Sequence, residues 1–125
     1  MRRQSLRRSA DFRRAYRQGV SAAGKYVVVY AVQNGLPIVR TGYPVGKKYG
    51  GAVQRNRIRR LMKESVRLCQ LVPGSGYDLV LVPRRRIAQD APGCQSVLAD
   101  LESVLNRLNL SEEAVRECEQ NDGQG

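Results

Sequence analysis

The chain has 125 residues, and its 22 Lys and Arg against 11 Asp and Glu give it a formal net charge of +11. It contains no His, which excludes histidine general bases, Ser-His-Asp and Cys-His nucleophiles, and two-His zinc sites. The length fits one domain with a modest core, and 42% hydrophobic with 26% charged residues is the composition of a folded protein. So large a positive excess on a small domain indicates a polyanionic partner, of which nucleic acid is the simplest.

The positive charge lies almost entirely before residue 87. Residues 1–86 hold 20 basic and 3 acidic residues, a net of +17, whereas residues 87–125 hold 2 basic and 8 acidic residues, a net of −6. Only four of the 22 basic residues are lysine, and this bias toward arginine suits phosphate recognition and stacking on bases. A GC-rich genome would produce the same bias, so the bias alone does not identify the partner.

Cysteine usage and hydropathy indicate the compartment. The three cysteines form no C-x-x-C pair, which argues against a zinc site and favours a reducing cytosol. The longest apolar run, residues 26–32, is too short to span a bilayer. An Arg-rich start is also typical of mitochondrial transit peptides, but Asp11 and Phe12 fit a folded helix better. We therefore expect a cytoplasmic protein with no membrane partner, no small-molecule substrate and no metal site of its own.

The first predicted elements are a helix and two strands. The sequence predicts a helix over residues 9–18, with Ser9 as its N-cap. Residues 25–33 are rich in β-branched and aromatic side chains and predict a strand. The turn signal Asn-Gly-Leu-Pro follows, and it predicts a hairpin with a second strand over residues 38–45.

The longest predicted helix covers residues 52–69. Its expected buried side consists of Ile58, Leu61, Met62, Ser65, Leu68 and Cys69. Basic residues recur every four positions on another face, namely Arg55, Arg59, Lys63 and Arg67. Such charges often form no more than a solvated face. However, like charges four residues apart cost roughly 0.2–0.5 kcal/mol per pair in an isolated helix, so the repeat favours contact with a polyanion.

The rest of the chain predicts a strand and further helices. Residues 77–82 are a nearly continuous apolar run, typical of a central strand. Residues 84–93 are expected to form a loop, and the apolar spacing of residues 94–108 predicts an amphipathic helix. The order α-β-β-α-β-α, with a further acidic helix at the end, defines a single α+β domain with helices packed on one sheet. We place this domain at residues 1–110 and an acidic tail, partly helical or disordered, at residues 111–125.

The stretch between the second strand and the long helix carries the chemistry. Glycines and two lysines lead into a helix start, where exposed N–H groups and the helix dipole attract phosphate. Arg55, Asn56 and Arg57 add donors, and an Asn between two arginines suits a base, a ribose or a phosphate equally well. The P-loop pattern G-x-x-x-x-G-K-[ST] is not met, because the spacing differs and no hydroxyl follows the lysines.

A second candidate surface is aromatic. Phe12 and Tyr16 share a helix face, and Tyr26, Val28 and Tyr30 are expected on one strand face. These rings are either core or a stacking platform for unpaired nucleotides, on which each base contributes roughly 1–3 kcal/mol. The core is the better interpretation for Tyr26, whereas both stay open for Phe12 and Tyr30. A basic helix beside such a platform suits single-stranded RNA.

The run GKKYGGAVQRNRIRRLMKE resembles the signature of the bacterial ribonuclease P protein component, roughly S-K-K-x-G-x-A-V-x-R-N-R-x-[KR]-R. The pattern D-F-x3-Y at residues 11–16, the strand entry Gly-Tyr-Asp-Leu-Val and the closing helix follow in the expected order, so the resemblance covers about residues 5–108. It implies an α/β sandwich with a left-handed βαβ crossover around the R-N-R helix. The residues alone would not suggest that hand, since right-handed crossovers are the rule.

The resemblance also implies a function. In that family the RNA subunit is the catalyst and uses Mg²⁺ to remove the 5′ leader of precursor tRNA. The protein binds the catalytic RNA and holds the leader in a cleft between the first helix and the sheet. This chain would thus be a non-catalytic subunit of an endoribonuclease. The implied RNA-binding residues are Lys47, Lys48, Arg55, Asn56, Arg57, Arg59 and Arg60, and the implied leader-binding residues are Phe12, Tyr16 and Tyr30.

The sequence departs from the family pattern in three places. Pro44 and Gly46 replace the two serines before the lysines, Gly51 replaces a polar residue, and the acidic tail has no clear counterpart. Hydroxyl-mediated contacts are therefore not expected at positions 44 and 46. The alternative hypothesis is a structural or chaperoning RNA-binding protein, such as a ribosomal protein, and an aromatic cleft beside the R-N-R helix would distinguish the two.

Overall fold

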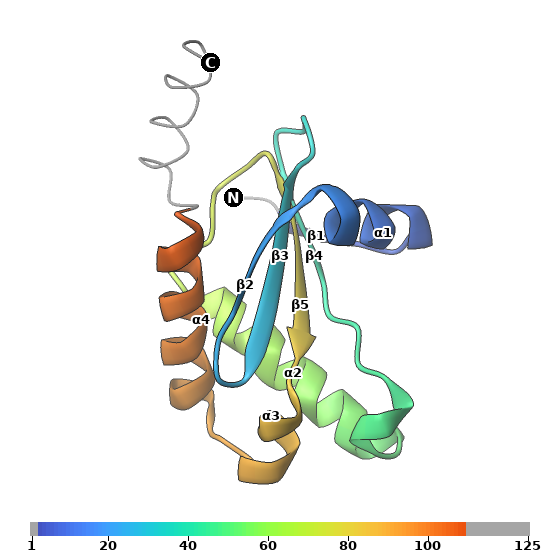
Figure 1. Cartoon of the computed structure of the whole chain (residues 1–125), viewed down its shortest axis with the longest axis vertical. Coiled ribbons are helices and arrows are strands. Elements are labelled where there is room, and N and C mark those ends of the chain that lie inside the picture. The colour runs from blue at the N-terminus through green and yellow to red at the C-terminus, as the bar shows by residue number, and fades with distance from the viewer. Residues whose placement is uncertain (1–2, 110–125) are drawn as a thin grey trace.

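Five short strands form one sheet in the order β1-β4-β5-β3-β2 (Figure 1). The computed structural model describes residues 3–109. The strands are β1 (Arg3–Ser5), β2 (Val20–Ala23), β3 (Val27–Gln33), β4 (Val39–Gly42) and β5 (Tyr77–Pro83). The helices are α1 (Ser9–Gln18), α2 (Ala52–Leu68), α3 (Arg85–Asp90) and α4 (Cys94–Leu108), and a short 3₁₀ helix, η1 (Lys47–Tyr49), precedes α2.

The strand pairing divides the sheet into two halves. β1, β4 and β5 run parallel to one another, whereas β5, β3 and β2 alternate in direction. β4 and β5 are neighbours joined through α2, so a βαβ unit surrounds the R-N-R helix. The left-handed course of that unit stays a prediction. The parallel register places Arg40 beside Asp78.

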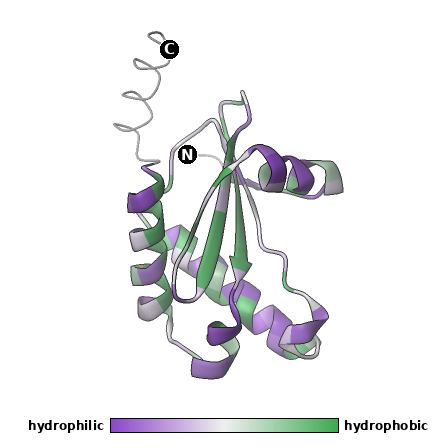
Figure 2. Ribbon diagram, viewed as in Figure 1, coloured by the Kyte–Doolittle hydropathy of each residue, from purple (hydrophilic) through white to green (hydrophobic). Residues whose placement is uncertain are grey.

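The two faces of the sheet carry different helices (Figure 1). On one face, alternate residues of β5 such as Leu79 and Leu81 join the main core with α2 and α4, which contribute Met62 and Leu101. On the other face α1 packs on β3 and β5, with Val80 in the smaller core. Figure 2 shows that β3 and β5, at the centre of the sheet, are strongly hydrophobic. The α+β class and the central position predicted for residues 77–82 are confirmed.

The predicted hairpin between residues 25–33 and 38–45 is wrong. β5 lies between β3 and β4, so these two strands are not neighbours. Just before β5, Gly76 accepts a hydrogen bond from the N–H of Asn34 and donates one to the carbonyl of Ile38. The physical reason is burial: β5 is buried on both faces at six of its seven positions and needs a partner strand on each side.

Four short elements are absent from the prediction: β1, β2, α3 and η1. β1 and β2 are edge strands of three and four residues, with few of the β-branched residues that signal a strand. α3 occupies most of the segment expected to be a loop, and Ala91, whose φ is +44°, is its C-cap. Ser9 is not an N-cap, because α1 begins at Ser9 and Arg8 takes the cap position without a side-chain hydrogen bond.

The long helix matches its predicted bounds to within one residue. Ile58, Met62 and Ser65 are buried as expected. Leu68 is 40% exposed and its predicted burial is wrong, while Val66 is buried in its place. Helix geometry accounts for the difference, because Val66 follows Met62 by four residues and lies on the same side, whereas Leu68 lies at its margin.

The turn between β2 and β3 rests on the last helix. The carboxylate of Asp100 in α4 accepts hydrogen bonds from the backbone N–H groups of Lys25, Tyr26 and Val27, at 2.7, 2.8 and 3.2 Å. Gly24 leaves room for that carboxylate, since a Cβ there would lie 2.5 Å from both of its oxygens. The acidic tail predicted at 111–125 lies outside the described residues. None of the helices within residues 3–109 combines the length and the apolar character needed to cross a bilayer.

Candidate nucleic-acid interface

The start of α2 presents its backbone N–H groups to the exterior. Gly51 is the N-cap and no side chain caps the helix. Gly50 has φ +120°, a conformation that favours glycine, and a Cβ there would lie 3.2 Å from the side chain of Gln54. Lys47 and Lys48 are exposed on η1 just before this helix start. Uncapped N–H groups with two ammonium groups nearby form a surface suited to phosphate.

Tyr49 anchors the loop that carries these lysines. Its ring is buried, and its hydroxyl donates a short hydrogen bond to the carbonyl of Pro83 at the end of β5. Burial raises the pKa of Tyr49, and the positive charge of Arg85 opposes this rise. Arg85 is exposed on α3, so α3 adds a cation to the lysine loop. Arg85 belongs to a run of three arginines in the sequence. Its place beside the lysine loop depends on α3, which the sequence did not predict.

The polar residues in the first half of α2 lie on two sides of the helix. Asn56, Arg57 and Arg60 line a surface hollow of about 390 Å³ together with the highly exposed Val53. Arg59 turns away from that hollow: its Nη1 donates to Oδ1 of Asn56 at 2.9 Å and its Nε donates to the carbonyl of Tyr43 at 3.3 Å. Asn56 therefore orients Arg59 and also borders the outer hollow.

Two of the basic residues on α2 differ from the others. Arg55 is half-buried, and its Nε is a buried atom with no hydrogen-bond partner among the described residues. Arg67 pairs with Glu64, and its Nε donates to Oε2 at 3.0 Å. The basic face is thus partly neutralised at its C-terminal end. The unneutralised cations concentrate in the first half of the helix.

A groove joins the basic helix to the aromatic helix. It has a volume of about 190 Å³ and is lined by residues from β1, α1, β4 and α2, namely Ser5, Leu6, Phe12, Thr41, Gly42, Tyr43, Pro44, Arg59 and Lys63. Nζ of Lys63 lies 5.8 Å from the centroid of the Tyr43 ring. Neither Tyr43 nor Lys63 was among the predicted site residues. The only sequence signal for Tyr43 is an aromatic residue directly after a strand.

Phe12 forms one wall of this groove. Its ring lies against Gly42, where a Cβ would be 2.5 Å from the nearest ring atom. The ring is half-buried and also packs on the smaller core with Leu6 and Val80. Phe12 therefore fits both of the interpretations left open from the sequence, since one part of it packs on the core and another part borders the groove.

The three tyrosines separate into different environments. Tyr16 is 41% exposed and meets Tyr30 edge-on, with ring centroids 4.9 Å apart and an interplanar angle of 85°. Tyr30 is half-buried against the smaller core. Burial, and to a lesser extent Tyr30, raises the pKa of Tyr16. Tyr26 belongs to the main core, as expected, and its hydroxyl donates to Asp90 at 3.2 Å. Tyr26 and Tyr30 do not share a face.

A buried carboxylate holds α1 on the sheet. Asp78 of β5 is fully buried and accepts hydrogen bonds from Arg14 at 3.0 Å, from Asn34 at 2.9 Å and twice from Arg40. Burial alone would raise the pKa of Asp78, but the hydrogen bonds from Arg40 and Asn34 and the charges of both arginines outweigh it and lower the pKa. The network links α1, β4 and β5, so it fixes the helix that carries Phe12 and Tyr16.

The fold and this interface define a class of protein: a single-domain α+β protein in which cations and half-buried aromatic rings border one groove, as in nucleic-acid-binding domains. The family model described as Ribonuclease P matches residues 1–109. The chain therefore belongs to the bacterial ribonuclease P protein component family.

Individual relatives agree with this assignment. The ribonuclease P protein component of Caldanaerobacter subterraneus subsp. tengcongensis is 38% identical over 111 residues, which cover 89% of this chain and 94% of that protein. That of Natranaerobius thermophilus is 44% identical over 73% of this chain and 80% of its own length. The solved RNase P protein from Thermotoga maritima has a TM-score of 0.73 at 30% identity and matches 83% of this chain and 96% of that one. The Staphylococcus aureus RNase P protein has a TM-score of 0.70 at 31% identity, over 85% and 95% of the two chains.

Proposed function

We propose that this chain is the protein subunit of ribonuclease P. In this proposal it binds the catalytic RNA and the 5′ leader of precursor tRNA in the cytoplasm and assists endonucleolytic removal of that leader. The observation that carries the proposal is the groove, because one hollow brings Phe12 together with Arg59 and Lys63. A base that stacks on an aromatic ring there has cations within reach of its neighbouring phosphates.

The two sides of α2 suggest a division of labour. The outer hollow of Asn56, Arg57 and Arg60 has no aromatic side chain in its lining, so together with the lysines of η1 it suits the phosphate backbone of the catalytic RNA. The inner side, with Arg59, faces the groove and suits the single-stranded leader. Tyr16 extends the aromatic surface beyond the groove, since its ring is exposed and lies edge-on to Tyr30.

The proposal assigns the chemical step to the RNA subunit. A Mg²⁺ site needs several carboxylate or carbonyl oxygens turned toward one point. Within residues 3–109 no three Cys, Asp or Glu side chains converge in that way. Asp78 and Asp11 bind Arg40, Glu64 binds Arg67, and Asp100 is occupied by backbone N–H groups. These carboxylates do not fit Mg²⁺, and we assign the ion to the RNA.

Reconstitution tests this function directly. The full chain alone, incubated with precursor tRNA and Mg²⁺, should cleave nothing. Added to the catalytic RNA at low Mg²⁺, it should raise the rate of leader removal, measured by the release of the 5′ fragment. Cleavage by the purified protein without RNA would contradict the proposal, as would an unchanged rate when protein and RNA are combined.

A general RNA-binding protein is the second candidate, because the outer hollow of α2 would serve it equally well. Photo-crosslinking from position 16, which lies beside Tyr30, separates the two. The proposed function predicts capture of the leader of precursor tRNA and no capture of mature tRNA. Equal capture of both would favour the general binder. A photoreactive group at position 86 serves as the control, because Arg86 belongs to α3, which lies at the opposite end of the sheet from α1 (Figure 1).

A further inference from the structure

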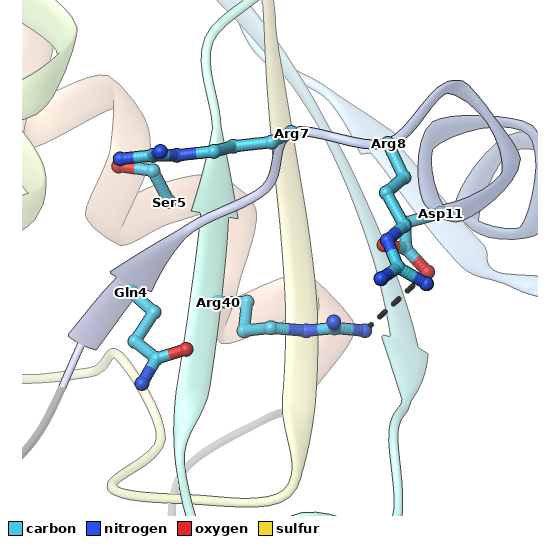
Figure 3. Close-up of a pocket in the computed structure, with 6 residues that line it drawn as sticks. All are labelled: Gln4, Ser5, Arg7, Arg8, Asp11 and Arg40. Carbon is cyan, nitrogen blue, oxygen red and sulfur yellow. Dashed lines mark ion pairs between the residues drawn. The ribbon is translucent and has the colours of Figure 1, made fainter.

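A second hollow, the arginine hollow, opens where β1 meets the start of α1 (Figure 3). Its volume is about 370 Å³, and its lining is polar or charged throughout: Gln4, Ser5, Arg7, Arg8, Asp11 and Arg40. None of these residues belongs to the RNA-binding or leader-binding sets predicted from the sequence. The hollow contains three arginines against one aspartate, and it has no aromatic side chain.

Arg40 is held in place at the base of this hollow. Its Nε and Nη2 donate to the two oxygens of the buried Asp78 at 2.8 and 2.7 Å, and Nη2 also lies 3.5 Å from Asp11. Its remaining terminal nitrogen, Nη1, has no partner among residues 3–109. A guanidinium clamped on one side and open on the other is oriented before any ligand arrives, so binding costs it little rotational freedom.

Arg7 and Arg8 form the rim. Both are exposed, and within the described part of the chain neither has an ion-pair partner. Figure 3 shows that their side chains leave the β1–α1 connection in different directions, Arg7 toward Ser5 and Arg8 toward Asp11. Asp11 is already compensated by Arg40. The hollow therefore keeps a positive excess, and its planar donors match phosphate geometry.

The arginine hollow adjoins the groove. Ser5 lines both, and β1 ends at Ser5, so the two hollows follow one another along the same edge of the sheet. When one base of an RNA strand lies against Phe12 in the groove, the adjoining part of the same strand therefore reaches the arginines. Because the arginine hollow offers cations and no ring, it suits the backbone of that strand rather than a base.

We propose that the arginine hollow binds a backbone phosphate of the precursor leader, in the part of the leader that extends beyond the groove. This inference rests on the proposed function. It adds Arg7, Arg8 and Arg40 to the leader-binding residues and makes leader length a determinant of affinity. The catalytic RNA is the other source of the same phosphodiester chemistry, and the experiment separates the two.

The test uses the full chain assembled with its catalytic RNA. The variant Arg7→Ala/Arg8→Ala removes two exposed cations without disturbing the buried Arg40–Asp78 pair. The control Arg13→Ala/Arg17→Ala removes two exposed cations from α1 that do not line the hollow. Affinity is measured for precursor tRNAs with a graded series of leader lengths, and assembly with the catalytic RNA is measured separately.

We expect Arg7→Ala/Arg8→Ala to weaken binding of long-leader precursors by about three- to tenfold and to reduce the salt dependence of that binding. Short-leader precursors and assembly should match the wild type. An equal loss at all leader lengths, or weakened assembly, would assign the arginines to the catalytic RNA and overturn the proposal. The same loss of affinity in the control variant would mean that the effect comes from non-specific charge, and this too would overturn the proposal. Wild-type binding by Arg7→Ala/Arg8→Ala would overturn it while leaving intact the proposed leader binding by the aromatic surface, which is tested at Tyr16.

Discussion

Arg40 of β4 forms two parallel hydrogen bonds with the fully buried carboxylate of Asp78 on the adjacent strand β5. The same carboxylate also forms an ion pair with Arg14 of α1. One buried anion therefore connects two strands of the sheet with the helix that carries the aromatic residues of the site. Removal of only one partner of such a buried pair strongly destabilises a fold.

Asp78→Asn should therefore destabilise the protein by up to about 3 kcal/mol, the low end of the range for a buried pair, because Arg40 and Arg14 lose their counter-charge but remain partly exposed to water. The pH dependence gives a second readout. Since the folded-state pKa of Asp78 is lowered, the unfolded chain binds more protons, and the stabilisation present above about pH 4 is lost as pH falls through the folded pKa. Urea unfolding at a series of acidic pH values should show a steeper loss for the wild type than for Asp78→Asn. Parallel curves would contradict the assignment.

Gly42→Ala should displace the Phe12 ring, since the new Cβ would lie 2.5 Å from it. We expect a loss of about 1–3 kcal/mol in the free energy of unfolding, the usual cost of overpacking. Gly46→Ala is the matched control, because a Cβ there meets nothing within 4 Å. In the double variant Phe12→Ala/Gly42→Ala, the cost of adding the methyl group at position 42 should largely vanish. An unchanged cost would mean that Gly42 is required for another reason.

Tyr16→Ala should weaken binding of precursor tRNA by about 1–3 kcal/mol if an exposed ring stacks on a leader base. Tyr16→Phe keeps the ring and should bind like the wild type. The fold should be little affected by either change, because Tyr16 is 41% exposed. Equilibrium binding to precursor and mature tRNA provides the measurement, and an equal loss for both RNAs would contradict a role in leader binding.

Arg57→Ala should weaken RNA binding and lower the slope of log K against log salt by about one phosphate contact. Arg57 is exposed and lines the outer hollow of α2. Arg67→Ala is the control on the same helix, because Arg67 is already paired with Glu64 and should change the slope less. Equal slopes for Arg57→Ala and the wild type would place Arg57 outside the interface.

Local patterns predicted the helices better than the strand pairing. The boundaries of α1, α2 and α4 follow from apolar spacing and from glycines, which are short-range signals. The hairpin failed because a turn signal specifies a reversal of the chain and not which strand fills the space beside it. β5 takes that place through its burial on both faces, a long-range competition that the turn residues 34–37 do not reveal.

The sequence could predict which residues are candidates for the site, but not how they are arranged in space. Asn56, Arg57 and Tyr16 are exposed, whereas Arg55 is half-buried. The orientation of Arg59 depends on its hydrogen bonds to Asn56 and to the carbonyl of Tyr43, which the sequence does not reveal. Nothing in the sequence indicates that Arg40 and Asp78 form a pair, since 37 residues separate them. Only the parallel β4–β5 register brings them together.

The Asp100 carboxylate under the β2–β3 turn has a consequence for biosynthesis. This carboxylate accepts hydrogen bonds from the backbone N–H groups of residues 25–27, which lie about 75 positions earlier in the chain. During translation this turn emerges long before its acceptor exists, so the edge of the sheet is completed only after α4 has been made. A chain released before residue 100 would leave these three amides to water and would lose most of the packing of α4 on the sheet, so it would not complete this edge of the domain.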